Sequence, residues 1–298
     1  MSKWIAASAA LALILGAPLA VAEVGSSKLP ISLSAVDKDG KPLPTYIVPK
    51  DADILRHDNA EQIMQGKRLL NETKRLLPEN VGANMNCNSC HVAQGKMHFG
   101  APYLNTVNSF PQFNPRAERV MTLEERVNGC FMRSMNGKPL AIDSKEMQAI
   151  VAYMQWLAQD VPHGGKAVEL VNSGPIDMSL TPDPVRGQAI YAKQCATCHG
   201  VNGEGMMDGA GNVMFPPLWG EESFNIGAGL ARLYKAAQFV KYNMPMGVSK
   251  TKPWGQGNVL SDQDAVDVAG YFTQMQRPDF PAKVNDWPSG KKPKDARY

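Results

Sequence analysis

Two short stretches, CNSCH at residues 87–91 and CATCH at residues 195–199, decide most of what this sequence implies about its fold. Each has two cysteines separated by two residues and followed directly by a histidine. In this C-x-x-C-H spacing the two thiols bond to the vinyl groups of one porphyrin, and the histidine reaches the iron. We therefore expect two covalent haem c groups, with iron, attached through Cys87, Cys90, Cys195 and Cys198. The expected proximal iron ligands are His91 and His199.

Paired cysteines have two other common uses, zinc binding and short disulfides. A zinc site needs four ligands, and the remaining histidines are not arranged to complete two such sites. Disulfides are typical of exported proteins. Two copies of the full C-x-x-C-H motif favour haem attachment over both alternatives.

The first residues indicate export. Residues 1–22 combine a positive Lys3, an apolar run and the small-x-small sequence AVA at 20–22, which is the pattern of a cleaved signal peptide. The alternative, a membrane anchor, needs roughly 20 apolar residues, more than this run supplies. We expect a periplasmic protein without a membrane span after signal removal. Its 31 basic and 28 acidic residues give too small a net charge to argue for nucleic acid as a partner.

Similar patterns flank both motifs and indicate a tandem repeat. A helix is predicted before each motif, over residues 61–77 and 184–194, and another near the end of each half, over 144–159 and 261–275. The later two begin with serine as N-cap and then place apolar residues at helical spacing. This order is similar to the class I cytochrome c fold. We therefore expect an all-α chain with two tandem class I cytochrome c-like domains and one haem in each.

The expected segments are a signal peptide (1–22), an extended N-terminal segment (23–50), a first cytochrome c domain (51–160), a Gly- and Pro-containing linker (161–183), a second cytochrome c domain (184–277) and a C-terminal extension (278–298). In class I cytochromes the sixth iron ligand comes from the loop before the last helix. In the second domain that loop contains Met244 followed by proline, with Met246 as the alternative. A His/Met haem suits electron transfer.

The first domain has no Met-Pro at the equivalent place and carries Cys130 in the stretch EERVNGCFMRSMNGKPL (124–140). A thiolate is a strong iron donor and a nucleophile. An inert buried thiol or an intermolecular disulfide would also explain a fifth cysteine. Alternative iron ligands nearby are His98, Met132 and Met135.

If the segment around Cys130 is helical, Arg126, Arg133 and Ser134 share its face. Arg116 and Lys138 flank the segment, so several cations would surround the thiolate and form an anion pocket. The alternative is that Arg126 and Arg133 are solvated and pair with the neighbouring Glu124 and Glu125.

Several segments together resemble the dihaem thiosulfate dehydrogenases. They are CNSCH, PRAERVMTLEERVNGCFMRSMNGKPL, EMQAIVAYMQWL, CATCHG, PPLWG, SFNIGAG and NMP, and they span about residues 60 to 277. The resemblance implies that Cys130 is the sixth ligand of a catalytic haem and that Arg116, Arg126 and Ser134 line the substrate pocket. It also implies a second haem with His/Met ligation or with a lysine beside the methionine. Asn243 precedes Met244 here, which leaves Met244 as the implied ligand.

The implied reaction joins two thiosulfates into tetrathionate and passes two electrons to a small periplasmic cytochrome or similar acceptor, with the favoured direction left open. As a hypothesis, thiosulfate adds to the Cys130 sulfur when the thiolate leaves the iron, and a second thiosulfate then releases tetrathionate. Two alternatives remain: a dihaem electron carrier without a substrate, and a Cys-ligated haem subunit of a multi-protein sulfur-oxidation system. A dihaem peroxidase is disfavoured because no pattern for an open iron is present.

Overall fold

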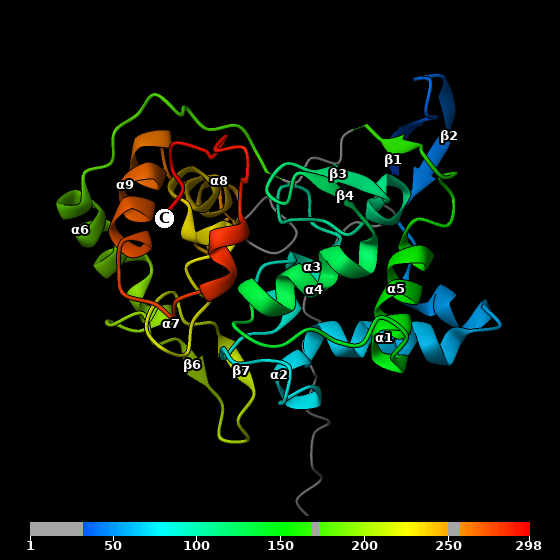
Figure 1. The fold of residues 1–298 in the computed structure, drawn as a ribbon, viewed down its shortest axis with the longest axis horizontal. Coiled ribbons are helices and arrows are strands. Elements are labelled where there is room, and N and C mark those ends of the chain that lie inside the picture. Colours follow the sequence, from blue (N-terminus) through cyan, green and yellow to red (C-terminus); the bar gives the residue numbers. More distant parts are fainter. Residues whose placement is uncertain (1–31, 169–172, 250–256) are drawn as a thin grey trace, which may run out of the picture.

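The computed structural model describes residues 32–168, 173–249 and 257–298, so the expected signal peptide lies outside the described residues. Figure 1 shows two groups of helices side by side, α1 to α5 in one and α6 to α9 in the other. Within the described ranges, no helix combines the length and apolar character needed to cross a membrane.

In the first group, α1 (Ala60–Asn71) crosses α5 (Lys145–Leu157) at very short range. A methyl group added at Gly66 of α1 would lie 1.9 Å from the backbone oxygen of Ala149 and 2.9 Å from Cβ of Tyr153. The helix α5 begins where predicted, because Ser144 Oγ accepts a hydrogen bond from the Met147 amide at 3.2 Å. The crossing buries the apolar faces of both helices against the haem motif between them.

The second group repeats this crossing between α6 (Pro184–Gln194) and α9 (Asp262–Thr273). A methyl group at Gly187 would lie 2.1 Å from the backbone oxygen of Asp267 and 3.0 Å from Cβ of Tyr271. Ser261 caps α9 in a reciprocal pair with Asp264. Three of the four predicted helices are confirmed, and the one expected over 61–77 is divided at Glu72 into α1 and α2. In both halves a glycine of the first helix packs against a backbone carbonyl and a tyrosine of the last helix.

The other helices hold the haem motifs and the loops around them. They are α2 (Thr73–Leu76), α3 (Val92–Gly95), α4 (Leu123–Arg133), α7 (Ala196–His199) and α8 (Leu233–Asn243). The short strands are β1 (Ser32–Val36), β2 (Pro42–Ile47), β3 (Gln112–Asn114), β4 (Arg119–Met121), β5 (Lys166–Ala167), β6 (Met206–Met207) and β7 (Val213–Phe215). The chain is thus helix-rich and not all-α, which corrects the sequence-based expectation.

The strands β2, β1 and β5 form an antiparallel sheet in that order. Ala35 of β1 pairs with Leu43 of β2 on one side and with Ala167 of β5 on the other. Tyr46 is fully buried, and its hydroxyl donates to the backbone oxygen of Leu157 at the end of α5. The described part of the N-terminal segment therefore covers the first domain.

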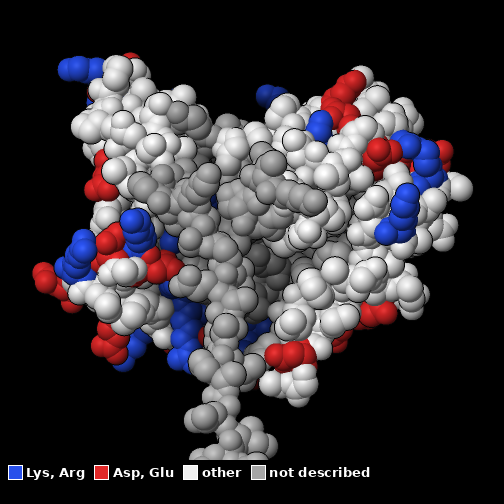
Figure 2. All heavy atoms as spheres, turned by 180° about the vertical axis from the view of Figure 1, so that it is seen from behind, with Lys and Arg blue, Asp and Glu red and all other residues white. Residues whose placement is uncertain are grey.

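The loop at residues 220–228 and the C-terminal extension lie between the two halves and contact the first half; we call this contact region the seam. Asn225 donates from Nδ2 to the backbone oxygen of Met132 at 2.8 Å, and its amide donates to the Arg133 oxygen at 3.1 Å. Phe224 is buried in the hydrophobic core of the first half. The C-terminal segment runs along this seam in Figure 1. On the face shown in Figure 2, basic and acidic side chains are mixed.

Gly66→Ala is expected to destabilise the haem-loaded protein by about 3 kcal/mol, because the added methyl group would push α1 away from the α5 backbone. Thermal unfolding followed by far-UV circular dichroism measures the change. Gly129→Ala is the matched control. A methyl group at Gly129 of α4 meets no atom within 4 Å, so the gain in helix propensity should stabilise α4 by about 1 kcal/mol. Equal melting temperatures for Gly66→Ala and the wild type would contradict this account of the crossing.

Candidate active site

The helix α4 carries Cys130 and begins at a capping box that the sequence encodes locally. Thr122 Oγ1 accepts from the Glu125 amide at 3.3 Å, and the Thr122 amide donates to Glu125 Oε2 at 2.9 Å. Further along, buried Asn128 exchanges two hydrogen bonds with the backbone of Leu140, at 2.9 and 2.8 Å. Phe131 is only 1% exposed in the core. These contacts set the rotation of α4 and hence the direction of the Cys130 side chain.

The Cys130 thiol lies between a cation and the haem-motif histidine. Arg126, one turn earlier on α4, donates from Nη1 to Cys130 Sγ at 3.0 Å. Burial raises the pKa of the thiol, but the positive charge of Arg126 and the hydrogen bond with His91 outweigh it and lower that pKa to about 6. Burial raises the pKa of Cys87 and Cys90 to about 12. Of the cysteines in this half, Cys130 is the one set up as a thiolate at neutral pH.

His91 is held in one orientation. Its Nδ1 donates to the backbone oxygen of Ala101 at 2.5 Å, which leaves Nε2 as the nitrogen for a metal. The ring stacks on Tyr103 with centroids 4.1 Å apart and planes 20° apart. Tyr103 was not predicted as a site residue, because nothing in its local sequence marks it. It lies next to Cys87, Cys130 and Arg126, and burial raises its pKa well above the usual value.

In the second half, His199 is held in the same way. Its Nδ1 donates to the Pro216 oxygen at 2.8 Å. Burial lowers the pKa of His199 and favours the neutral ring that metal ligation needs. Cys195 and Cys198 are free thiols, as are Cys87 and Cys90. The donor sets in both halves fit haem c: two unpaired thiols beside a histidine whose second nitrogen is anchored to a carbonyl.

The structure also bears on the alternatives to haem attachment and to Cys130 as an iron ligand. Neither short disulfide is formed. Across residues 32–168, 173–249 and 257–298, no three His, Cys, Asp or Glu side chains come together as a zinc site would require. His98, an alternative ligand to Cys130, is exposed and packs against the ring of Phe99. Met135, another alternative, is 4% exposed within the core.

Met244 follows directly after α8 and packs half-buried against the core of the second half, with Cys195 in the same cluster. Met246, its alternative, is 45% exposed. The preceding residue, Asn243, is fully buried and donates from Nδ2 to the Phe99 oxygen at 3.0 Å. Since Ala101, two residues after Phe99, holds His91, this short loop links the histidine of the first motif with the segment that carries Met244.

Arg133 and Arg116 have partners that the sequence did not predict. Arg133 forms a bidentate ion pair with Asp286 of the C-terminal extension, at 2.8 and 2.7 Å, and lies 4.2 Å from the ring centroid of Phe280. Arg116 donates from Nη1 to the Gly227 oxygen at 2.5 Å and lies 3.9 Å from the Asp286 carboxylate. Burial, and then the charge of Arg133, lower the pKa of Arg116.

These contacts change the picture of the predicted anion pocket. The structure places Arg126 at Cys130, whereas Arg133 and Arg116 meet at the seam with Asp286. The alternative, that Arg133 pairs with a neighbouring glutamate, is wrong, because Arg133 pairs with Asp286. Glu125 pairs with Arg119 at 2.8 Å. Ser134 is half-buried and ends α4 one turn after Cys130. The substrate-contact roles of Arg116 and Ser134 stay predictions.

Asp286→Asn is expected to destabilise the haem-loaded protein by about 3 kcal/mol, because removing one partner of a buried pair leaves the arginines facing each other. Asp286 is 4% exposed and Arg133 is 19% exposed at their side chains. Asp279→Asn is the control, since Asp279 is 60% exposed and pairs with Lys283 at the surface. Melting temperatures of the two variants give the comparison, and an equal effect of both would contradict the structural role of Asp286.

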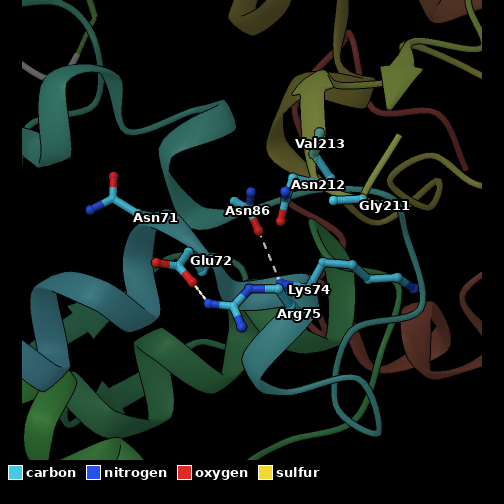
Figure 3. Close-up of a pocket in the computed structure, with 9 residues that line it drawn as sticks. Asn71, Glu72, Lys74, Arg75, Asn86, Gly211, Asn212 and Val213 are labelled. Atoms are coloured by element: carbon cyan, nitrogen blue, oxygen red, sulfur yellow. Dashed lines mark hydrogen bonds and ion pairs between the residues drawn. The ribbon is translucent and has the colours of Figure 1, made fainter. Parts of the chain in front are cut away.

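A separate cavity of about 460 Å³ lies between α2 and the turn that joins β6 to β7 (Figure 3). Its walls carry Lys74, Arg75 and Asn86 from the first half and Asn212 from the second. Arg75 pairs with Glu72, and the Lys74 amide donates to Asn86 Oδ1 at 3.0 Å. Cys130 and Arg126 do not line this cavity, so it is not where the thiolate would meet a substrate.

Comparisons with known proteins agree with this geometry. Residues 78–162 match the model of the SoxA/TsdA cytochrome c domain, and residues 184–276 match the model of cytochrome c. The chain is 42% identical to a thiosulfate dehydrogenase of Psychrobacter arcticus, over 85% of this chain and 75% of that protein. The chain belongs to the thiosulfate dehydrogenase family. A thiosulfate dehydrogenase of Allochromatium vinosum is 40% identical, over 82% of this chain and 89% of that protein.

A solved thiosulfate dehydrogenase, TsdBA from Marichromatium purpuratum, has a similar structure. It superposes with a TM-score of 0.68 and 32% identity over 78% of this chain. The match spans 48% of the solved chain, so this sequence matches about half the length of that relative. The two cytochrome c domains imply covalent haem c with iron in this chain.

Proposed function

We propose that this protein is a periplasmic dihaem cytochrome c that oxidises two thiosulfates to one tetrathionate and delivers the electrons to a small cytochrome or similar acceptor. The observation that carries the proposal is the position of Cys130, a thiol of lowered pKa between Arg126 and His91. An electron carrier without a substrate has no use for an activated thiol at this place. The thiosulfate dehydrogenase names of the relatives supply the substrate.

One haem is proposed in each domain, within residues 51–160 and 184–277, with 161–183 as the linker and 278–298 as an extension that braces the seam. Cys87 and Cys90 hold the first haem, with His91 and Cys130 as iron ligands. Cys195 and Cys198 hold the second, with His199 and Met244 as iron ligands. When bound, the two haems supply acceptors for two electrons, one each. Residues 1–22 are proposed as the export signal.

Arg126 is proposed to bind thiosulfate beside the thiol. Thiosulfate is a dianion, and a guanidinium can hold its oxygens by charge-assisted hydrogen bonds. Arg126 is exposed along part of its side chain while its Nη1 reaches Cys130. It can therefore contact an incoming anion and the reacting sulfur together. Arg116 and Ser134 are proposed to complete the pocket, with Ser134 following Cys130 at the end of the same helix.

The Cys130 thiolate is proposed to react in two steps, first as a bond-forming partner and then as a leaving group. First, its Sγ forms a sulfur–sulfur bond with the outer sulfur of one thiosulfate, and the two electrons released by this oxidation leave to the acceptors. Second, the outer sulfur of another thiosulfate attacks the bound sulfur, so that tetrathionate departs and the Cys130 thiolate is regenerated. Each step brings two anions together, and the charge of Arg126 offsets part of their repulsion.

The test uses the haem-loaded protein with free thiosulfate and an artificial electron acceptor, and quantifies tetrathionate. Two thiosulfates consumed per tetrathionate formed is the expected result. A protein with both haems intact and reducible that forms no tetrathionate would overturn the proposal and leave the carrier as the better description. Activity only with thiosulfate attached to a carrier protein would instead indicate the subunit of a multi-protein sulfur-oxidation system.

A further inference from the structure

Arg277 is a buried cation whose partners are backbone carbonyls and an aromatic ring. Its residue is 8% exposed. Nη2 donates to the Phe272 oxygen at 2.9 Å, Nη1 donates to the Phe224 oxygen at 3.4 Å, and the guanidinium lies 4.3 Å from the ring centroid of Phe224. Its Nε is buried and has no hydrogen-bond partner in the described residues. The side chain thus keeps a donor that nothing in the described chain uses.

A second cation, Arg297, stands close enough to Arg277 to repel it. Burial, and then the charge of Arg297, lower the pKa of Arg277 to about 9. The Nη1 atom of Arg297 is also buried without a hydrogen-bond partner in the described residues. Two neighbouring guanidiniums, each with a buried donor that has no partner in the described chain, cost free energy unless an anion binds them, because each loses hydration without compensation.

Two other buried arginines of this chain each have a carboxylate partner, which Arg277 and Arg297 lack in the part of the chain that the structure describes. Arg133 has the Asp286 carboxylate, and Arg232 has the Asp295 carboxylate at 2.6 and 2.9 Å. Asp295 lies only two residues before Arg297, but Arg232 and the Tyr234 amide occupy its oxygens. Among the described residues, the hydrogen bonds and ion pairs provide no carboxylate to Arg277 or Arg297. These two residues therefore form a site suited to an anion that the described polypeptide does not supply.

The place of this site in the fold favours one anion. Phe272, which Arg277 contacts, belongs to the same core cluster as Cys195 and Met244. Phe224, whose ring packs into the core of the first half, lies in the loop that follows β7, and Pro216 at the start of that loop holds the ring of His199 through its oxygen. Arg277 is thus bound through backbone oxygens to α9 and to the loop after Pro216, both of which belong to the second half of the chain. Haem c carries two propionate carboxylates and is the anionic group that this domain holds.

We propose that Arg277 and Arg297 bind a propionate of the haem attached to Cys195 and Cys198. This assignment needs a haem in the second domain but does not depend on thiosulfate turnover. The two guanidiniums neutralise the carboxylate and keep it ionised at neutral pH. Because a nearby cation favours the electron-rich, reduced haem, the two arginines raise the reduction potential of the second haem.

The test measures the reduction potentials of both haems in the haem-loaded protein by spectroelectrochemical titration from about pH 5 to about pH 8. Arg277→Gln is expected to lower the potential of the second haem and to make it rise as the pH falls, because the propionate then takes up a proton. Arg277→Lys keeps the charge and should restore most of the potential. Arg297→Gln should act in the same direction by a smaller amount, and it covers the case that Arg277→Gln fails to fold.

Lys235→Gln is the matched control, because Lys235 is an exposed residue of α8 in the same domain and its loss should leave both potentials unchanged. Unchanged potentials in the Arg277 and Arg297 variants, or a shift of the first haem alone, would overturn the assignment. A free anion is the other source of the same chemistry. If sulfate raised the melting temperature of the wild type but not of Arg277→Gln, with the potentials equal, the site would bind a free anion and the proposal would be wrong.

Discussion

Cys130→Ala is expected to reduce thiosulfate oxidation by on the order of 10³-fold or more, because loss of a covalent nucleophile leaves only binding and electrostatic effects. The thiol is the group that the structure places beside both Arg126 and His91. Steady-state turnover of the haem-loaded variant, with haem content checked at two per chain, gives the measurement. Haem attachment should persist, since Cys87 and Cys90 are untouched.

Met132→Leu is the matched control on the same helix. Met132 is half-buried two residues from Cys130, and its backbone oxygen rather than its side chain accepts the hydrogen bond of Asn225. Its turnover should stay close to that of the wild type. Full turnover by Cys130→Ala would refute the covalent mechanism. A large loss in Met132→Leu with normal haem content would return Met132 to consideration as an iron ligand.

Arg126→Gln is expected to lower kcat/KM for thiosulfate by roughly 10- to 100-fold, the usual range for a lost hydrogen bond to a charged group. Arg126 supplies the cation nearest to Cys130 Sγ, at 3.0 Å. Both KM and kcat should change, because the same guanidinium is proposed to bind the anion and to stabilise the reacting thiolate. Initial rates over a range of thiosulfate concentrations separate the two effects.

Arg119→Gln serves as the charge-matched control for Arg126. Arg119 lies on β4, its side chain is 54% exposed, and it pairs with Glu125 at 2.8 Å. Its loss removes one positive charge from the same region without touching Cys130. If both variants lost activity equally, the effect would reflect general attraction of thiosulfate to the surface and not a contact at the thiol.

Local sequence was enough to predict the haem motifs and the helices before and after them, whereas α8 was not predicted. The C-x-x-C-H spacing acts within one turn of chain, and Thr122, Ser144 and Ser261 cap their helices through neighbours three residues away. The helical spacing of Arg126 and Cys130 also operates over one turn. Such features depend on short-range geometry, so the sequence contains them without any knowledge of the fold.

The small sheet was missed because β2 (PLPTYI) contains two prolines and β5 has only two residues, so neither is recognisable as a strand from its own sequence. The two residues of β5, Lys166 and Ala167, become a strand only by pairing with β1. The N-terminal segment was expected to be extended, and its order comes from burying Tyr46 against α5. Neither partner is near in sequence, so the pairing is set by packing.

The sequence by itself determined the two C-x-x-C-H motifs, the paired helices around them and the placing of Cys130 one turn from Arg126. Only the tertiary structure decided which cation contacts the Cys130 thiol. Arg133 shares a helical face with Cys130, yet it turns to Asp286 because a buried carboxylate from the C-terminal extension reaches it there. Ion pairs between distant segments depend on how those segments pack together, and local sequence patterns do not predict that packing.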